Sequence, residues 1–313
     1  MVHRLGGDLG CELSLASRTG LLDVRSGGWW AEAVEWSGLD PDSMPPLNTA
    51  GTIYGRVSDT LPGLERLAGA ALTTAGHDHL CGSVGVGVTH AGQVMDSCGT
   101  AEALVRAVPV GVYPDLAAGH PLGVEAGWHV IPGHYALLGG LSLGLNLLPV
   151  LEALRVESRD GRTPLDQGAL TIAEAHAPTD AVLHESVRSL RDQLNLDQWL
   201  LAHRDESPEQ LWYRVMQTAV TSSHDLLEGL EKLGGALSQV VASGGWSKNP
   251  LLRLLKARVF PPLTYPLVDE AGIRGAGLLA GIAAGVFGGV SDFPDPPSDH
   301  VGETMSSTPA VHP

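Results

Sequence analysis

Positively charged side chains are scarce in this sequence, and their scarcity excludes several classes of partner. The chain of 313 residues has 19 Lys and Arg against 35 Asp and Glu, which gives a formal net charge of −16. The lysines, Lys232, Lys248 and Lys256, form no basic cluster. Because nucleic acids and anionic membranes bind proteins through basic patches, we expect neither as a partner. An anionic small molecule remains possible, since backbone N–H groups can bind phosphates.

Cysteine is also rare, and the few cysteines exclude two kinds of site. Cys11, Cys81 and Cys98 lack the CxxC spacing of zinc sites, and three cysteines do not make a disulfide framework. The opening residues MVHRLGGDLG contain no apolar stretch of the kind found in a signal peptide. We therefore expect a cytoplasmic protein with reduced thiols.

Long hydrophobic runs are missing as well. The uncharged stretch GAGLLAGIAAGVFGGV at 275–290 is shorter than the roughly 20 residues that a transmembrane helix needs. Its glycines repeat at a spacing of four, as they do where membrane helices pair. We nevertheless interpret this stretch as a buried helix that packs closely against a sheet. The apolar stretch at 130–151 contains His134, Asn146 and two prolines, which do not suit a membrane span.

Glycine and small apolar residues are abundant. The chain has 40 Gly and 21 Pro, and 43% of its residues are hydrophobic although only 5% are aromatic. This composition favours a mixed α/β protein with tight turns over a helical bundle. The length fits two domains or one large domain.

The pattern of apolar residues predicts several elements. Alternation at 93–108 predicts a strand–turn–strand hairpin, and 127–140 predicts two further short strands. Apolar residues at helical spacing over 208–234, with a glycine at the end, predict a long amphipathic helix. The segments 237–260 and 263–287 each predict a strand, a loop and a helix.

The hairpin turn DSCGT (96–100) is a candidate phosphate site. Glycine lets the backbone approach a ligand closely, and consecutive N–H groups in such a turn can form an anion-binding nest. The alternative is a hairpin turn without a ligand, in which Gly99 and Thr100 are ordinary residues. Glu102, just after the turn, could contact a substrate, but an exposed glutamate on a strand is the expectation.

A second candidate is the segment VVASGGWSKNPLL (240–252). An apolar strand ends at Gly244 and Gly245, and a helix is predicted to begin at Asn249 and Pro250, which are typical capping and first-turn residues. Nucleotides bind α/β proteins at such strand–glycine–helix connections. The segment is neither a Walker A loop nor a GxGxxG motif, and a tight turn without a ligand is the alternative.

The third candidate is AGHDHLCGSVGVG (75–87), in which Asp78 stands between His77 and His79. We expect a short strand to carry these residues, so that the histidines share one face and Asp78 lies on the other. The three side chains would then not converge on a metal ion. An aspartate at a strand end can act as a general base for a hydroxyl group. The alternative is that Asp78 caps the following helix.

Five segments together resemble, in order, the FGGY family of carbohydrate kinases over about residues 1–288. They are VHRLGGDLGCELSLASRTGLLDVRSGGWW (2–30), GHDHLCG (76–82), MDSCGTAEAL (95–104), ASGGWSKNPLLRLLKARVF (242–260) and EAGIRGAGLLAGIAAGVF (270–287). The resemblance implies an α/β, actin-like and ribonuclease-H-like fold, with ATP and sugar in a cleft between two domains. Within that fold we expect a complete C-terminal domain and an incomplete N-terminal domain.

The resemblance also implies domain limits. Residues 1–90 would be the remnant of the N-terminal, sugar-binding domain, and residues 91–288 would be the C-terminal, nucleotide-binding domain. Residues 289–313, rich in Pro, Ser and Asp, are expected to form a disordered tail because they cannot bury enough apolar surface.

Individual residues acquire implied roles in the same way. Asp78 would be the catalytic base, and His79 would contact hydroxyl groups of the substrate. The residues implied to bind ATP are Ser97, Gly99 and Thr100 at the phosphates, Gly139 and Gly140 in a further glycine-rich segment, and Gly244, Gly245 and Asn249 at the adenosine. Mg²⁺ would be held mainly by phosphates and water, without a metal site built from protein side chains.

One family motif has no counterpart in this chain. Members begin with a phosphate-binding hairpin of the Asp-x-Gly-Thr type, which GGDLGCE at 6–12 does not match. We therefore interpret the chain as a fragment or half of an ATP-dependent carbohydrate kinase that binds ATP and a sugar or polyol. A separate N-terminal kinase half is a further expected partner. The alternative is a catalytically inactive nucleotide-binding module or remnant.

Overall fold

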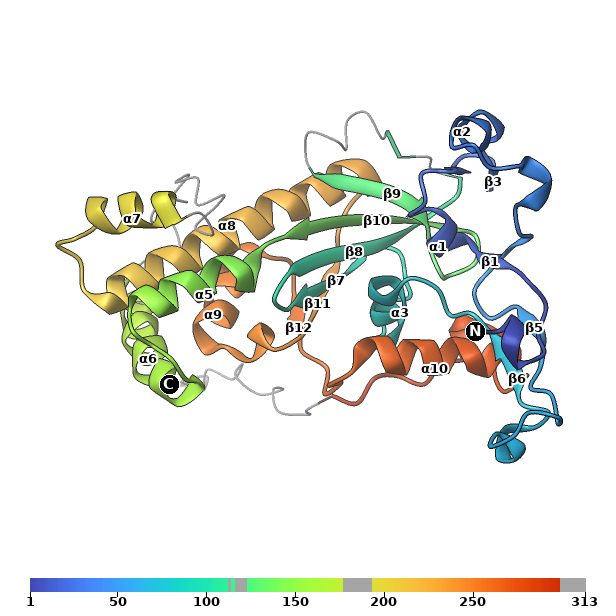
Figure 1. Cartoon of the computed structure of the whole chain (residues 1–313). Coiled ribbons are helices and arrows are strands. Elements are labelled where there is room, and N and C mark those ends of the chain that lie inside the picture. The colour runs from blue at the N-terminus through green and yellow to red at the C-terminus, as the bar shows by residue number, and fades with distance from the viewer. Residues whose placement is uncertain (112–113, 116–122, 177–192, 299–313) are drawn as a thin grey trace, which may run out of the picture.

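A mixed six-stranded sheet forms the centre of the computed structural model, which describes residues 1–111, 114–115, 123–176 and 193–298 (Figure 1). Three strands at one side of the sheet are parallel, and the other neighbours are antiparallel. In spatial order the strands are β12 (Leu263–Thr264), β11 (Gln239–Ser243), β7 (Gln93–Cys98), β8 (Glu102–Pro109), β10 (His134–Leu141) and β9 (Val124–Trp128). The predicted hairpin is confirmed as β7 and β8, and the predicted strands at 127–140 are parts of β9 and β10.

The described helices are α1 (Leu13–Ala16), α2 (Ala31–Trp36), α3 (Asp78–Gly85), α5 (Leu143–Ala153), α6 (Arg159–Ala175), α7 (Gln193–Ala202), α8 (Pro208–Gly234), α9 (Pro250–Val259) and α10 (Ala271–Ala283). Helix α8 packs on one face of the sheet, and α3 with α10 packs on the other. None of the described helices is long and apolar enough to cross a membrane.

The hairpin strands are apolar on both faces because each face is covered. Val94 and Leu104 pack with α8, whereas the adjacent residues Met95 and Val105 pack with α3 and α10 on the opposite face. Neighbouring residues of a strand point to opposite sides, so this alternation places every second side chain in the α8 layer. Asp96, Cys98 and Glu102 belong to that same series.

The long helix α8 is confirmed at the predicted limits. It begins with a capping box in which Ser207 and Gln210 bond each other's backbone N–H groups. Its fully buried Trp212 belongs to a further core with α5, α6 and α9. Helix α6 lies in a polar stretch of the sequence for which no element was predicted.

Helix α10 is the predicted apolar helix, and its Leu278 and Leu279 share a core with the sheet residues Met95 and Val105. It also packs closely against α3, and its glycines permit this contact: a Cβ atom added at Gly275 would be 1.8 Å from the carbonyl oxygen of Cys81. Leu278 and Leu279 are buried, whereas Ile273 on the other side is 72% exposed.

The N-terminal segment forms small paired elements beside the sheet (Figure 1). These are β1 (Cys11–Glu12) with β4 (Leu47–Asn48), β2 (Leu22–Asp23) with β3 (Gly28–Trp29), and β5 (Ile53–Arg56) with β6 (Ala71–Thr73). The prediction that a strand carries residues 77–79 is wrong. Strand β6 ends at Thr73, and Asp78 is the first residue of α3.

The expected disordered tail does not begin at residue 289. Phe293 packs edge-to-face on Phe287 at 5.2 Å between ring centroids, and Arg274 Nη2 donates to the carbonyl oxygens of Pro294 and Asp295. The apolar ring and the arginine fix residues 289–298 beside α10, which composition alone did not indicate. Residues 299–313 lie outside the described part of the chain.

Candidate functional site

Two of the predicted nucleotide-binding segments lie next to each other. Strand β11 runs parallel to β7, with Ser243 opposite Ser97. Gly244 follows with φ of +90°, and a Cβ atom there would be 2.6 Å from the carbonyl oxygen of Cys98. Only glycine combines this backbone conformation with this close approach. The sequence GG after β11 thus brings the Gly244–Asn249 loop onto the Ser97–Thr100 turn.

A third segment, not foreseen from the sequence, completes this arrangement. The backbone N–H of Leu145, in the first turn of α5, donates to the carbonyl oxygen of Thr100 at 3.0 Å. A Cβ atom at Gly144 would be 2.9 Å from the carbonyl oxygen of Gly99 and 2.8 Å from Trp246 Nε1. A glycine between a strand and an apolar helix was the available signal in the sequence.

The surface of this arrangement offers backbone and small polar groups. Thr100 and Gly245 are exposed and Ser97 is half-buried. Among the described residues, no atom lies within 4 Å of the position that a Gly245 side chain would take. Asn249 is buried and caps α9 through a 3.0 Å hydrogen bond from Leu252 N–H to its Oδ1, as predicted. Its Nδ2 is buried without a hydrogen-bond partner among the described residues.

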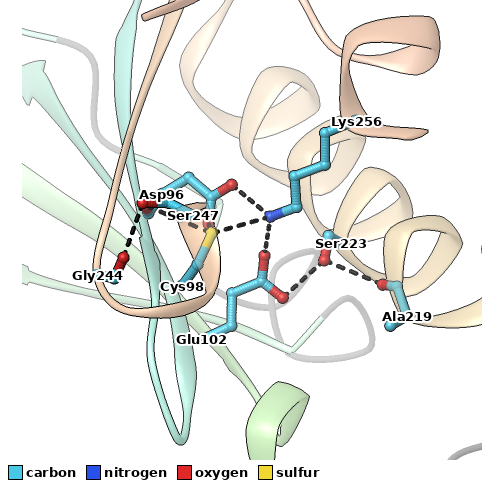
Figure 2. Close-up of polar contacts among 8 residues, drawn as sticks. All are labelled: Asp96, Cys98, Glu102, Ala219, Ser223, Gly244, Ser247 and Lys256. Atoms are coloured by element: carbon cyan, nitrogen blue, oxygen red, sulfur yellow. Dashed lines mark hydrogen bonds and ion pairs between the residues drawn. The ribbon is translucent and has the colours of Figure 1, made fainter. Parts of the chain in front are cut away.

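A buried ion cluster lies at the base of the Ser97–Thr100 turn (Figure 2). Lys256 of α9 donates from Nζ to Asp96 Oδ2 at 2.5 Å, to Cys98 Sγ at 3.3 Å and to Glu102 Oε1. Ser223 of α8 donates to the other oxygen of Glu102 at 2.7 Å. The prediction that Glu102 is exposed is wrong, since it is 1% exposed. The turn leaves its carboxylate in the α8 layer, where Lys256 compensates the charge.

The charges in this cluster depend on one another. Burial alone would lower the pKa of Lys256, but Asp96 and Glu102 outweigh that effect and raise the pKa well above its usual value. Burial raises the pKa of Glu102 to about 7, despite the opposing charge of Lys256. Burial and Asp96 raise the pKa of the Cys98 thiol well above its ordinary range. The ammonium therefore stays charged and the thiol stays protonated at neutral pH.

This cluster has the residue types of a metal site but already contains a cation. One ligand atom from each of Asp96, Cys98 and Glu102 lies within 4.8 Å of the others. The Lys256 ammonium donates to all three residues, so it occupies the position between them that a metal ion would need. In the described arrangement this group therefore binds the Lys256 ammonium and serves the protein structure.

Asp78 lies at the beginning of α3 with its side chain 84% exposed. Its Oδ1 is 3.2 Å from His77 Nδ1 and accepts the backbone N–H of His79 at 2.8 Å. The rings of His77 and His79 stack with centroids 5.7 Å apart. Burial, and then the charge of Arg18, lower the pKa of His77 below its ordinary value. The exposed carboxylate is thus accessible to a hydroxyl group, with two imidazoles beside it.

The N-terminal segment supports the loop that carries Asp78. The backbone N–H of His77 donates to Ser14 Oγ at 2.9 Å, and Ser14 donates to the Glu12 carboxylate. Glu12 is 1% exposed and also accepts the N–H groups of Ser14 and Leu15, so it caps α1. Burial raises its pKa more than these bonds lower it. No spacing of residues in the sequence indicates this support.

Arg18 adds hydrogen-bond donors near His77. Its Nη1 pairs with Glu125 Oε2 at 3.0 Å. Its Nε and Nη2 are buried and have no hydrogen-bond partner within the part of the chain that the structure describes. These atoms form the edge of a guanidinium that suits bidentate recognition of oxygen atoms.

Gly139 and Gly140 are placed differently from the nucleotide-binding segments. Gly139 lies within β10, where a Cβ atom would be 2.4 Å from Leu226 Cδ1 of α8. Its missing side chain therefore makes room for α8. Gly140 is exposed and pairs with Ala103, next to the beginning of β8.

Comparison with known proteins finds a matching family model and relatives that align with most of this chain. Residues 1–85 match the family model described as "FGGY family of carbohydrate kinases, N-terminal domain". The autoinducer-2 kinase of Klebsiella pneumoniae is 27% identical over 303 residues, which are 92% of this chain and 56% of that protein. The autoinducer-2 kinase of Yersinia pestis is 27% identical over 304 residues, with the same coverage. The chain spans about half the length of these curated relatives.

Solved structures show the same fold. The xylulose kinase of Brucella ovis gives a TM-score of 0.73 at 19% identity, covering 95% of this chain and 61% of that one. A glycerol kinase of Plasmodium falciparum with ADP gives a TM-score of 0.69 at 15% identity, covering 92% and 57%. These similarities confirm the expected α/β, actin-like fold.

Proposed function

Since residues 1–85 match the FGGY family model and 92% of the chain aligns with autoinducer-2 kinases at 27% identity, we propose that the chain belongs to the FGGY family of carbohydrate kinases. Within that family we propose that it is the nucleotide-binding part of an ATP-dependent kinase that phosphorylates a sugar or polyol hydroxyl. The observation that carries this proposal is the close approach of the Gly244–Asn249 loop to the Ser97–Thr100 turn. The first is a strand–glycine–helix connection and the second is a glycine turn, and nucleotides use both.

In this proposal the nucleotide lies along the two segments. Ser97, Gly99 and Thr100 bind phosphate oxygens, while Gly244, Gly245 and Asn249 line the adenosine pocket. Mg²⁺ accompanies the nucleotide and is held by phosphates and water. This assignment fits the chemistry of the donors, because both acidic side chains beneath the turn are already paired with Lys256.

Asp78 is the proposed general base. It orients the acceptor hydroxyl and takes its proton as the oxygen attacks the γ-phosphorus of ATP and ADP leaves. Its exposed carboxylate at the beginning of α3 supports this role. His79 contacts hydroxyl groups of the substrate in the same proposal.

The proposed domain limits remain 1–90 for the N-terminal part and 91–288 for the nucleotide-binding part. The chain spans about 56% of its curated relatives, so further sugar-binding surface comes from elsewhere in this proposal, through a separate N-terminal kinase half. The proposed location is the cytoplasm, where thiols such as the free Cys11, Cys81 and Cys98 stay reduced.

The same coverage favours a second candidate function, a nucleotide-binding module without turnover. Titration calorimetry with Mg·ATP and an assay of ADP release with sugars and polyols separate the two. We expect weak ATP binding, and ADP release near background from the chain alone. Turnover that appears only after an N-terminal half is added supports the kinase, whereas binding that never leads to turnover supports the module.

The pocket is tested with the substitution Gly245→Trp. Gly245 has helical backbone angles and open space around it, so a tryptophan fits without strain and covers the proposed adenosine site. Gly277→Trp is the matched control, since Gly277 is exposed on α10 with no atom within 4 Å. We expect only Gly245→Trp to abolish binding of ATP. Unchanged binding in that variant would rule out the proposed pocket.

A further inference from the structure

Lys256 links the two proposed nucleotide-binding segments. Helix α9 begins directly after the Gly244–Asn249 loop, with Asn249 as its cap. Less than two turns later the same helix carries Lys256, which contacts both strands at the base of the Ser97–Thr100 turn. We propose that Lys256 is a positioning residue that fixes the distance between the turn and the loop, an inference that rests on the proposed function.

The contacts of Lys256 fit this role because they surround the turn. Asp96 and Cys98 are near the end of β7, and Glu102 is the first residue of β8, so the ammonium holds the chain on both sides of residues 97–101. Figure 2 shows the three side chains pointing toward Nζ from the hairpin, with Ser223 behind Glu102. The turn and α9 therefore meet at one nitrogen atom, and α8 joins this group through the hydrogen bond of Ser223 to Glu102.

Lys256 cannot bind the nucleotide itself in this arrangement. An ammonium group has three N–H donors, and here each of them has an acceptor. The side chain is 2% exposed, and Asp96 and Glu102 are as deeply buried. Any effect of Lys256 on a ligand must therefore pass through the position of the turn.

Stability alone does not explain such a cluster. Buried ion pairs often contribute little compared with apolar residues of similar volume, because removing the charges from water is costly. Charged groups add directional contacts. The hydrogen bonds from Lys256 to two carboxylates fix the position of α9 relative to the hairpin, which apolar contacts would not do. A ligand that touches both segments benefits from this fixed geometry, whereas a ligand that touches only one does not.

Ligands that touch one segment or both can therefore distinguish a positioning role of Lys256 from a purely structural role. ATP spans both segments, adenosine occupies only the loop, and inorganic tripolyphosphate occupies only the turn. Removing Lys256 should weaken ATP binding at least tenfold but change the Kd of adenosine and of tripolyphosphate less than threefold. The three Kd values are measured by titration calorimetry or NMR line shifts, with cooperative unfolding recorded for every variant.

Lys256→Met leaves two buried carboxylates uncompensated and can fail to fold. The second variant, Asp96→Asn with Glu102→Gln and Lys256→Met, removes all three charges while keeping the volumes similar. Arg258→Met is the matched control, because Arg258 is on the same helix and donates to Ala173 O of α6, away from the hairpin.

Three outcomes decide the inference. Loss of ATP affinity alone, in the folded triple variant but not in Arg258→Met, supports it. Unchanged ATP affinity, or an equal loss for all three ligands, overturns it while leaving the proposed function intact. A wild-type chain that binds no ATP overturns the proposed function and the inference together.

Discussion

Gly76 lies so close to Ser14 that a Cβ atom added at Gly76 would be 2.6 Å from the Ser14 Oγ and 2.8 Å from Glu12 Oε2. Gly76 also has φ of +111°, a conformation that residues with a side chain rarely adopt. The same Ser14 oxygen accepts the backbone N–H of His77. The position of Asp78, two residues after Gly76, therefore depends on a contact with the N-terminal segment that only glycine permits.

Replacing Gly76 by alanine should destabilise the protein strongly. The left-handed backbone costs about 1–2 kcal/mol for a residue with a Cβ atom, and the overlap with Ser14 and Glu12 adds about 1–3 kcal/mol. The free energy of unfolding, measured in urea, should fall by about 3 kcal/mol. Gly20→Ala is the control, since Gly20 has φ of +75° but no atom within 4 Å, and it should lose only the smaller backbone contribution. Equal losses in both variants would contradict the close contact.

Glu102 should make stability depend on pH. Its pKa rises from 4.5 to about 7 on folding, so between these values the native state keeps a proton that the unfolded chain releases. The contribution of Glu102 to the free energy of unfolding is therefore fully present below pH 4.5 and is lost as pH rises through 7. The loss is about 3 kcal/mol. Glu102→Gln should remove this loss. Its stability relative to the wild type should thus increase between pH 4.5 and pH 8 in urea unfolding, and parallel curves for the two proteins would argue against the assignment.

The sequence predicted the hairpin, α8 and the strand–loop–helix of β11 and α9, because each has its own apolar period and end signals. It did not predict Lys256 as part of the site, although a signal was present. Lys256 lies four residues after Leu252, on the buried side of α9, and Asp96 directly follows the apolar residues Val94 and Met95 on β7. Charged residues on two buried faces require a partner, but which faces meet is decided by tertiary structure. Glu102 was interpreted wrongly for the same reason.

The error at Asp78 has a different origin. A short strand was expected to carry residues 77–79, but only His77 has extended angles, and the helix begins immediately after it. Local propensity is weak where Gly, Ala and Thr dominate, so packing of α3 against α10 decides the element. The fold of segments with strong periodicity was thus predictable. The roles of Glu12, Ser14 and Gly144 were not, because these residues act through contacts between distant parts of the chain.

The cysteines should differ in their reactivity toward an alkylating reagent. Burial raises the pKa of Cys81 to about 12 and that of Cys98 well above its ordinary range, while Cys11 is only half-buried. Because the thiolate is the reactive form, Cys11 should be modified first by iodoacetamide at pH 8. Mass spectrometry of peptides should find Cys81 and Cys98 modified only after unfolding in urea. Rapid modification of Cys98 in the folded protein would contradict the closed ion cluster around Lys256.

Asp78→Asn tests the proposed chemistry most directly. The carboxylate is 84% exposed, so the substitution should leave folding unchanged, and the amide keeps the shape but cannot accept the proton. In an assay of ADP release with a sugar or polyol, with an N-terminal half supplied where turnover requires it, kcat should fall about 10²–10⁴-fold.

His79→Ala is the matched comparison for Asp78→Asn. It should mainly raise KM for the sugar, because its proposed contact is with the bound substrate. Both variants should bind ATP as the wild type does, since neither residue belongs to the Ser97–Thr100 turn or the Gly244–Asn249 loop. Full turnover in Asp78→Asn would leave this residue only its place in the first turn of α3 and would assign the base to another group.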